Sequence, residues 1–309
     1  MRASTRFAAG VVAIVAAVLV ADARQSPVVP VAPGGTPQWR GRVDVVMVTA
    51  TVRDADGRLV TGLTASDFRV SDNGDPQPLT QFVTDRVPVS LGIVLDVSES
   101  MTGRRIEDAR FALRRFVSDL LDPEDEAFLV AFNHRPREIA PWTLQPASLA
   151  HVLDAVVPSG GTAMYDAIAD ALPRFDTRRH QRAALVVISD GADTASDIGL
   201  PRLRAELRRS DAFVYAIAID QPGRRPVSGR PDPHALREIT DDSGGYTEIV
   251  RDSVDLVEAT ARIAEELNSQ YLLGYAAPRP ADDTYHSIRV RLADPSLKVR
   301  HRRGYVAGR

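Results

Sequence analysis

The chain has 309 residues, with 38 Lys and Arg against 41 Asp and Glu, and 44% of its residues are hydrophobic. The length allows about two domains, and the near balance of charge excludes a partner held by bulk electrostatics, such as nucleic acid. Because the chain contains no cysteine, disulfides, Cys-ligated zinc, iron–sulfur clusters, thiol nucleophiles and an N-terminal lipid anchor on Cys are excluded. Any structural metal must be held by oxygen or imidazole.

The N-terminal residues predict an exported protein. Arg2 and Arg6 precede an unbroken apolar run over residues 7–21, which the small-residue pattern Ala21-Asp22-Ala23 follows. This pattern is typical of a cleavable signal peptide over residues 1–23, because the run is shorter than the roughly 20 residues of a spanning helix. An uncleaved anchor is the alternative. We expect a periplasmic or secreted protein with no transmembrane segment after cleavage.

Residues 24–40 are rich in Pro and Gly and predict a flexible linker, and residues 41–86 then predict a β segment. Alternating residues over 43–51 indicate a strand, and a second strand over 68–71 precedes Asn73-Gly74, a strong hairpin signal before a strand over 79–83. About 45 residues rarely form an independent core. We therefore expect this segment to pack on another part of the chain.

Residues 87–270 alternate apolar strands with helices. The predicted strands are 87–95, 127–132, 137–144, 184–189, 213–219 and 246–249, and the predicted helices are 106–120, 149–156, 163–175, 201–209, 233–240 and 253–268. The alternation predicts an α/β domain with a Rossmann-like, doubly wound, mostly parallel sheet, in which 137–144 forms an antiparallel edge strand.

The C-terminal residues 271–309 return to a strand pattern. Strands are predicted over 271–275, 287–293 and 298–305. We expect this segment to join the N-terminal β segment in a small flanking β domain. Six histidines lack H-x-x-x-H spacing, so surface positions are expected for them, and the basic C-terminal residues, Arg300 included, are expected on the solvated face of edge strands.

Three predicted loops carry oxygen donors at strand ends, where open α/β sheets bind ligands. The first contains Asp96, Ser98 and Ser100, whose spacing lets one carboxylate and two hydroxyls turn toward one point. The second places Thr162 where a helix N-cap is expected, and the third follows the strand ALVVI with Asp190. Five oxygen ligands with two formal charges suit a hard cation such as Mg²⁺, which keeps waters and leaves room for an outside ligand.

Each of these residues also has a simpler interpretation. Asp96 and Asp190 can cap helices or bind turn amides, and serines are common in loops. We expect Asp193 to be a turn or helix-capping residue and not a ligand, and Glu99 to be solvated. The sequence Asp54-Ala55-Asp56-Gly57 begins like a calcium loop, but no bidentate Glu follows at the required spacing, so it predicts a turn.

The three loops together resemble the metal-ion-dependent adhesion site of the von Willebrand factor type A family, which consists of an Asp-x-Ser-x-Ser loop, a distant Thr and a distant Asp. The resemblance covers about residues 88–270, and GLTASDFRVSDNG, YLLGY, RVRL and RRGYV outside it resemble bacterial exported proteins of this family. It implies a divalent ion, Mg²⁺ first and Mn²⁺ or Ca²⁺ as alternatives. The implied ligands, direct or through water, are Asp96, Ser98, Ser100, Thr162 and Asp190.

The sequence therefore predicts an exported, metal-dependent binding or adhesion module with no catalysis of its own. In members of the family that bind proteins, a carboxylate of the partner completes the coordination of the ion, so we expect a protein or other ligand that supplies an acidic group. A Mg²⁺-dependent hydrolase or a subunit of an enzyme complex is one alternative, because metal-bound water can assist hydrolysis. An ion that only holds the loops together is the other. Against catalysis, the sequence has no Asp-x-Asp pair at Asp96, no P-loop and no G-x-S-x-G.

Overall fold

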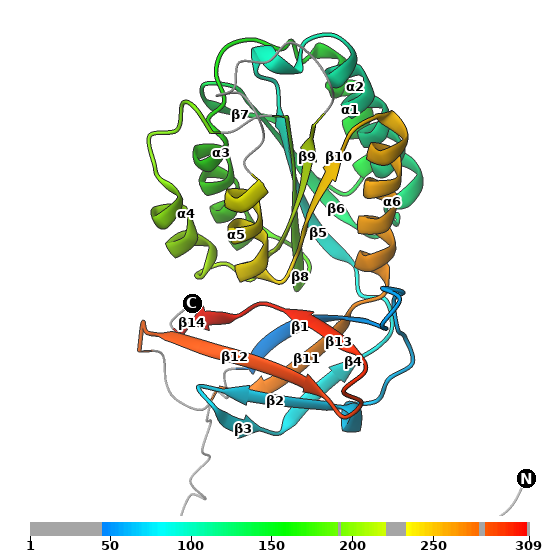
Figure 1. The fold of residues 1–309 in the computed structure, drawn as a ribbon, viewed down its shortest axis with the longest axis vertical. Helices are drawn as coiled ribbons and strands as arrows, with labels where there is room; N and C mark the ends of the chain where they lie inside the picture. Colours follow the sequence, from blue (N-terminus) through cyan, green and yellow to red (C-terminus); the bar gives the residue numbers. More distant parts are fainter. Residues whose placement is uncertain (1–44, 191–192, 221–232, 278–281, 308–309) are drawn as a thin grey trace, which may run out of the picture. The chain divides into compact units, whose positions relative to one another are not determined.

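The computed structural model describes residues 45–190, 193–220, 233–277 and 282–307 (Figure 1). The predicted signal peptide and linker lie outside the described residues. The fold-class prediction is confirmed, because a mostly parallel central sheet is accompanied by two antiparallel sheets. Within the described ranges, no helix combines the length and the apolar character needed to cross a membrane.

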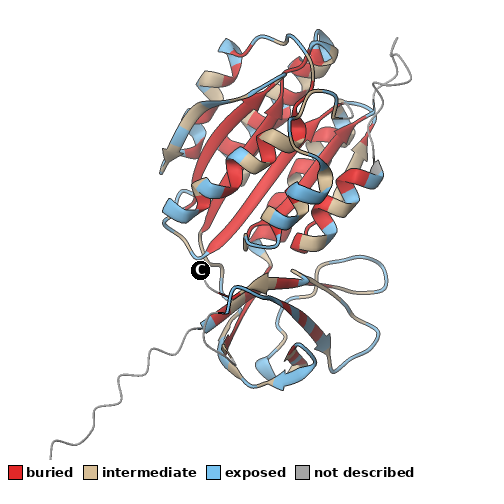
Figure 2. Ribbon diagram, turned by 90° about the vertical axis from the view of Figure 1, so that its left-hand side faces the viewer, coloured by how far each residue is buried: buried red, intermediate tan, exposed pale blue. Residues whose placement is uncertain are grey.

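The central sheet has six strands in the order β10-β9-β8-β5-β6-β7, and its neighbours are parallel except that β7 runs antiparallel to β6. The predicted antiparallel edge strand is therefore present. Strands β5, β6, β8 and β9 are buried at every residue (Figure 2), which is why they appear in the sequence as continuous apolar runs. The strands are β5 (Val89–Asp96), β6 (Glu126–Phe132), β7 (Pro136–Thr143), β8 (Arg182–Ser189), β9 (Phe213–Ile219) and β10 (Thr247–Val250).

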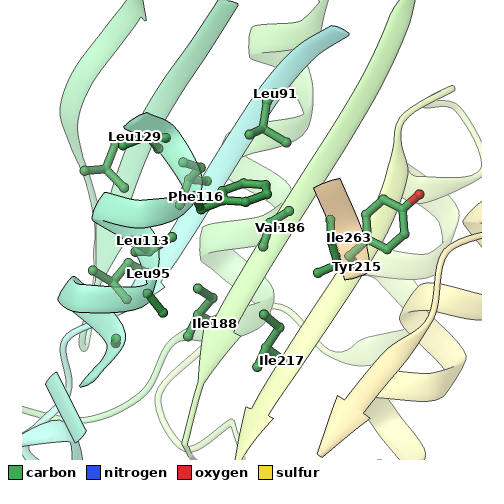
Figure 3. Close-up of a cluster of buried hydrophobic side chains, with 14 of the residues drawn as sticks. Leu91, Leu95, Leu113, Phe116, Leu129, Val186, Ile188, Tyr215, Ile217 and Ile263 are labelled. Atoms are coloured by element: carbon green, nitrogen blue, oxygen red, sulfur yellow. The ribbon is translucent and has the colours of Figure 1, made fainter. Parts of the chain in front are cut away.

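Helices cover both faces of the central sheet, with α1, α2 and α6 on one face and α3, α4 and α5 on the other (Figure 1). Because successive strand residues point to opposite faces, Leu91 and Leu95 of β5 pack with Leu113, Phe116 and Ile263 on the first face (Figure 3). The helices are α1 (Arg104–Arg115), α2 (Leu149–Val152), α3 (Met164–Ala171), α4 (Leu200–Leu207), α5 (Pro233–Ser243) and α6 (Ser253–Asn268).

Three helices are shorter than their apolar patterns indicate. Helix α1 passes into a π-helical turn over Phe116–Leu120, α2 into a 3₁₀ turn over Leu153–Ala155, and α3 into a 3₁₀ turn over Leu172–Thr177. In the last case Pro173 lacks the amide hydrogen that an α-helix needs. Apolar periodicity continues through these turns because they still pack against the core.

The remaining strands form two four-stranded antiparallel sheets, in the orders β13-β1-β11-β4 and β14-β12-β2-β3. N-terminal strand β1 lies between C-terminal strands β11 and β13, and β2 pairs with β12. Neither β segment therefore builds its sheets alone. The strands are β1 (Val45–Arg53), β2 (Phe68–Asp72), β3 (Asp75–Gln77), β4 (Leu79–Val83), β11 (Tyr271–Ala276), β12 (Tyr285–Leu292), β13 (Lys298–His301) and β14 (Gly304–Val306).

Two strand predictions in these sheets are wrong in detail. Asn73 and Gly74 form the predicted tight turn with φ of 50° and 93°, but the partner of β2 in the hairpin is the short β3, while β4 lies in the other sheet beside β11. The single strand predicted over 298–305 is divided into β13 and β14, also in different sheets. At Gly304 a Cβ would lie 2.2 Å from the carbonyl oxygen of His286, so only glycine allows this approach of two strands.

A buried polar cluster joins the N-terminal and C-terminal β segments. The carboxylate of Asp72 accepts hydrogen bonds from the hydroxyls of Tyr275 at 2.8 Å and Tyr305 at 2.9 Å, and it lies 3.1 Å from Nδ1 of His286. The expectation of a surface position is wrong for His286, which is 3% exposed. Side chains of β12 point alternately outward and inward, and the side chain of His286 points inward, where it contacts the carboxylate of Asp72.

A second buried carboxylate, Glu266 on α6, connects the central α/β elements to the antiparallel sheets. It accepts hydrogen bonds from the hydroxyls of Thr51 at 3.1 Å and Tyr215 at 3.0 Å, from Nη2 of Arg53 at 2.7 Å, and from Arg300. Glu266 is fully buried. The expected solvated position of Arg300 is therefore wrong, because this carboxylate draws its guanidinium inward.

We expect Glu266→Ala to lower the free energy of unfolding by about 3–5 kcal/mol, because it leaves two guanidinium groups without their buried counter-charge. Urea unfolding followed by circular dichroism measures this change. Glu265→Ala, at the exposed neighbouring position, is the matched control and should change the unfolding free energy by less than about 0.5 kcal/mol. Equal values for the two variants would contradict a linking role for Glu266.

Candidate metal centre

The order of strands brings the two predicted carboxylate ligands to one place. Strand β6 lies on one side of β5, and β8, the next parallel strand in the chain, lies on the other side. Doubly wound sheets bind ligands at such a reversal, at the carboxyl ends of the strands. Asp96 is the last residue of β5, and Asp190 directly follows β8. Both therefore stand at this point of reversal.

Asp96 is fully buried and held by two hydrogen bonds. Its Oδ1 accepts the amide of Ser98 at 2.8 Å, and its Oδ2 accepts the hydroxyl of Ser189. Burial and, to a smaller extent, the charge of Asp190 raise the pKa of Asp96 to about 6, against the hydrogen bonds from Ser189 and Ser98, which lower it. A positive charge beside this carboxylate would favour its ionised form.

The side-chain oxygens of Ser98, Ser100 and Asp190, three of the predicted metal ligands, are connected by hydrogen bonds. The hydroxyl oxygens of Ser98 and Ser100 are 3.0 Å apart, and the Ser100 hydroxyl donates to Oδ1 of Asp190 at 2.6 Å. Ser98 and Asp190 are buried, and Ser100 is half-buried. Together with Asp96, four of the five predicted ligands lie in one contiguous group of oxygen atoms.

Thr162 lies in the second loop, which backbone hydrogen bonds join to both other loops. Ser159 donates to the carbonyl of Val97 at 2.8 Å, the amide of Glu99 donates to the carbonyl of Gly160 at 3.0 Å, and Thr194 donates to the carbonyl of Thr162 at 2.8 Å. Backbone hydrogen bonds thus join the three loops to one another. As expected, the side chain of Glu99 is exposed.

The predicted N-cap role of Thr162 is wrong. Helix α3 begins at Met164 with Ala163 as its N-cap, so Thr162 precedes the cap by one residue. Within the described ranges, no hydrogen bond joins the Thr162 hydroxyl to the other four predicted ligands. Its ligand role, like theirs, stays a prediction.

The first turn of α3 is capped instead from the third loop. Oδ2 of Asp193 accepts the amide of Tyr165 at 2.9 Å and the hydroxyl of Ser196 at 2.6 Å, and the Ser196 hydroxyl accepts the amide of Asp166 at 3.0 Å. The capping role expected for Asp193 is confirmed. Sequence reasoning did not find Ser196, because the amide that it binds belongs to Asp166, thirty residues earlier in the chain.

Arg105 brings a positive charge to the same place. Its Nη1 donates to the carbonyl of Ser100 at 2.6 Å and lies 3.3 Å from Oδ2 of Asp190, and its side chain is 15% exposed. Local sequence patterns do not reveal this contact, because Asp190 lies far from Arg105 in the chain. The site therefore combines two carboxylates, the hydroxyls of Ser98 and Ser100, and one guanidinium.

The chemistry of the donors fits a hard divalent ion. All five predicted ligands offer oxygen, two of them as buried carboxylates, and hard cations prefer such ligands. In the part of the chain that the structure describes, no three His, Asp or Glu side chains form a metal-binding group. An ion held by these residues would depend on hydroxyls and water to complete its coordination.

The comparisons with known proteins concern the α/β part of the chain. The family model of the von Willebrand factor type A domain matches residues 91–192, which contain all five predicted ligands. The α/β part has the von Willebrand factor type A fold. Among solved structures, a von Willebrand factor type A protein from Catenulispora acidiphila superposes with a TM-score of 0.52 at 14% identity, covering 86% of this chain and 72% of that one.

Two curated relatives are inhibitor heavy chains. Inter-alpha-trypsin inhibitor heavy chain H2 from Sus scrofa is 25% identical over 205 residues, which cover 61% of this chain and 21% of that protein. Heavy chain H4 from Homo sapiens is 26% identical over 144 residues, covering 42% and 15%. The chain thus matches about a fifth or less of the length of these relatives. Neither name is that of an enzyme.

Removal of the Asp193 carboxylate should destabilise the type A fold modestly. We expect Asp193→Ala to lower the free energy of unfolding by about 1 kcal/mol, because the first turn of α3 loses its cap. Urea unfolding measures the loss. Asp197→Ala, an exposed acidic position in the same loop, is the control, and an equal effect there would contradict the capping role.

Proposed function

We propose that this protein is an exported binding module that captures a protein or another carboxylate-bearing ligand through a divalent ion, with Mg²⁺ as the first candidate. The observation that carries the proposal is the contact of Ser98, Ser100 and Asp190 beside the buried Asp96, at the point where the strand order reverses. The type A fold and the heavy-chain relatives support a binding module. The signal-peptide pattern supports export.

The five predicted residues have simple roles in this proposal. Asp96, Ser98, Ser100, Thr162 and Asp190 hold the ion, directly or through water, and the bound ion supplies a Lewis-acid centre for an incoming carboxylate. The hydroxyls contribute oxygen without negative charge, so the ion keeps its attraction for an anion. No catalytic step is part of the proposal.

Metal binding should depend on Asp96. We expect Mg²⁺ or Mn²⁺ to raise the melting temperature. At an ion concentration a hundred times the dissociation constant, binding should add about 2.7 kcal/mol to the free energy of unfolding. Asp96→Asn should abolish this rise, because the amide has the size of the carboxylate but lacks its charge. Thermal unfolding with the ion and with EDTA measures both.

Asp193→Asn is the matched control for this experiment. It removes a carboxylate from the third loop that caps α3 and is not a predicted ligand, so it should lower the melting temperature and keep the response to the ion. A response that survives in Asp96→Asn would refute the assigned site.

Ligand capture should also depend on the ion. The immobilised protein is expected to retain proteins from envelope or secreted fractions in Mg²⁺, to release them in EDTA, and to lose this capacity in Asp96→Asn while keeping it in Asp193→Asn. Quantitative mass spectrometry of the eluates compares the four conditions.

Two results would contradict the binding proposal. If EDTA lowers the melting temperature but leaves capture unchanged, the ion only holds the loops together. If the protein hydrolyses phosphoesters or peptides in the presence of Mg²⁺ and Asp96→Asn abolishes this activity, the site is catalytic.

A further inference from the structure

We propose that Arg105 is a built-in competitor of the divalent ion, whose guanidinium neutralises Asp190 when no ion is bound and thereby lowers the affinity of the site for divalent cations. This inference rests on the proposed function, since it takes Asp190 to be one of the ligands. It assigns to this arginine the regulation of metal occupancy.

The contacts of Arg105 involve two of the predicted ligand residues. Its Nη1 donates to the carbonyl of Ser100 and lies 3.3 Å from Oδ2 of Asp190, while the other oxygen of Asp190 accepts the Ser100 hydroxyl. Asp190 is fully buried and Arg105 is 15% exposed. A charge pair in these surroundings is screened by solvent much less than a surface pair.

The start of α1 gives Arg105 this position. Gly103, with φ of 80°, is the N-cap residue, so the helix begins at Arg104 immediately after the loop of Asp96. Side chains of an α-helix tilt toward its N-terminus, which for Arg105 is the side of the metal site. The adjacent Arg104 is 79% exposed and faces Asp108 at 3.6 Å along the helix.

A guanidinium and a divalent ion both attract the Asp190 carboxylate, and they repel each other. Replacing Arg105 with a neutral side chain removes this repulsion and leaves the Asp190 charge for the ion. Because the Coulomb energy between nearby charges is large in a partly buried site, we expect the dissociation constant for the ion to fall by about tenfold or more. A side chain with a merely structural role would weaken metal binding when it is replaced.

Isothermal titration with Mn²⁺ tests this inference on the chain without residues 1–23. We expect Arg105→Gln to bind Mn²⁺ about tenfold or more tightly than the wild type. Arg104→Gln removes the same charge one residue away and should change the dissociation constant by less than about twofold, because solvent and salt screen an exposed charge. In EDTA, Arg105→Gln should melt at a lower temperature than the wild type, and saturating Mn²⁺ should narrow that difference.

The outcomes distinguish a failure of the Arg105 inference from a failure of the proposed function. If the wild type binds Mn²⁺, Asp96→Asn abolishes binding, and Arg105→Gln binds equally or more weakly, the inference is overturned and the proposed function stands. If neither the wild type nor the Arg105 variants bind Mn²⁺, the proposed function fails and the inference with it. Binding by Arg105→Gln alone supports the inference. Arg105→Met, a second neutral variant, replaces the Gln variant if that one does not fold.

Discussion

The burial of β5 between β8 and β6 is the constraint on which the rest of the structure depends. At Gly92, in the middle of this strand, a Cβ would lie 2.6 Å from side-chain atoms of both Leu185 and Phe128. Side chains of the two neighbouring strands therefore fill the space beside this glycine. The strand order reverses at β5, and its last residue is Asp96. The same packing that fixes the sheet therefore sets a buried carboxylate at the point where the strand order reverses.

The antiparallel sheets depend on a different interaction, the burial of single carboxylates among donors from distant parts of the chain. Asp72 is bound by two tyrosines and a histidine of the C-terminal segment, and Glu266 is bound by groups from β1, β9 and β13. Charged groups are buried in proteins when they are paired and hydrogen-bonded. In both cases the carboxylate joins segments that the sequence separates by about two hundred residues.

Charge at the candidate site is balanced differently. Two carboxylates stand close together, and Asp190 is contacted by the hydroxyl of Ser100 and the guanidinium of Arg105. The loops are already joined by their backbones and by the cap of α3. The predicted ligand residues therefore lie on loops whose backbones are hydrogen-bonded to one another.

Local patterns in the sequence determined the strands of the central sheet, its antiparallel edge strand and the tight turn at Asn73, because burial on two faces and turn chemistry leave a mark in neighbouring residues. The motif Asp-x-Ser-x-Ser likewise pointed to the loop after β5. Only the tertiary structure decided that β13 and β14 lie in different sheets, that His286 and Arg300 turn inward, that Ala163 and not Thr162 caps α3, and that Arg105 meets Asp190. In each of these cases the deciding partner lies far away in the sequence or across a turn of backbone, so the contact that fixes the residue leaves no local pattern to read.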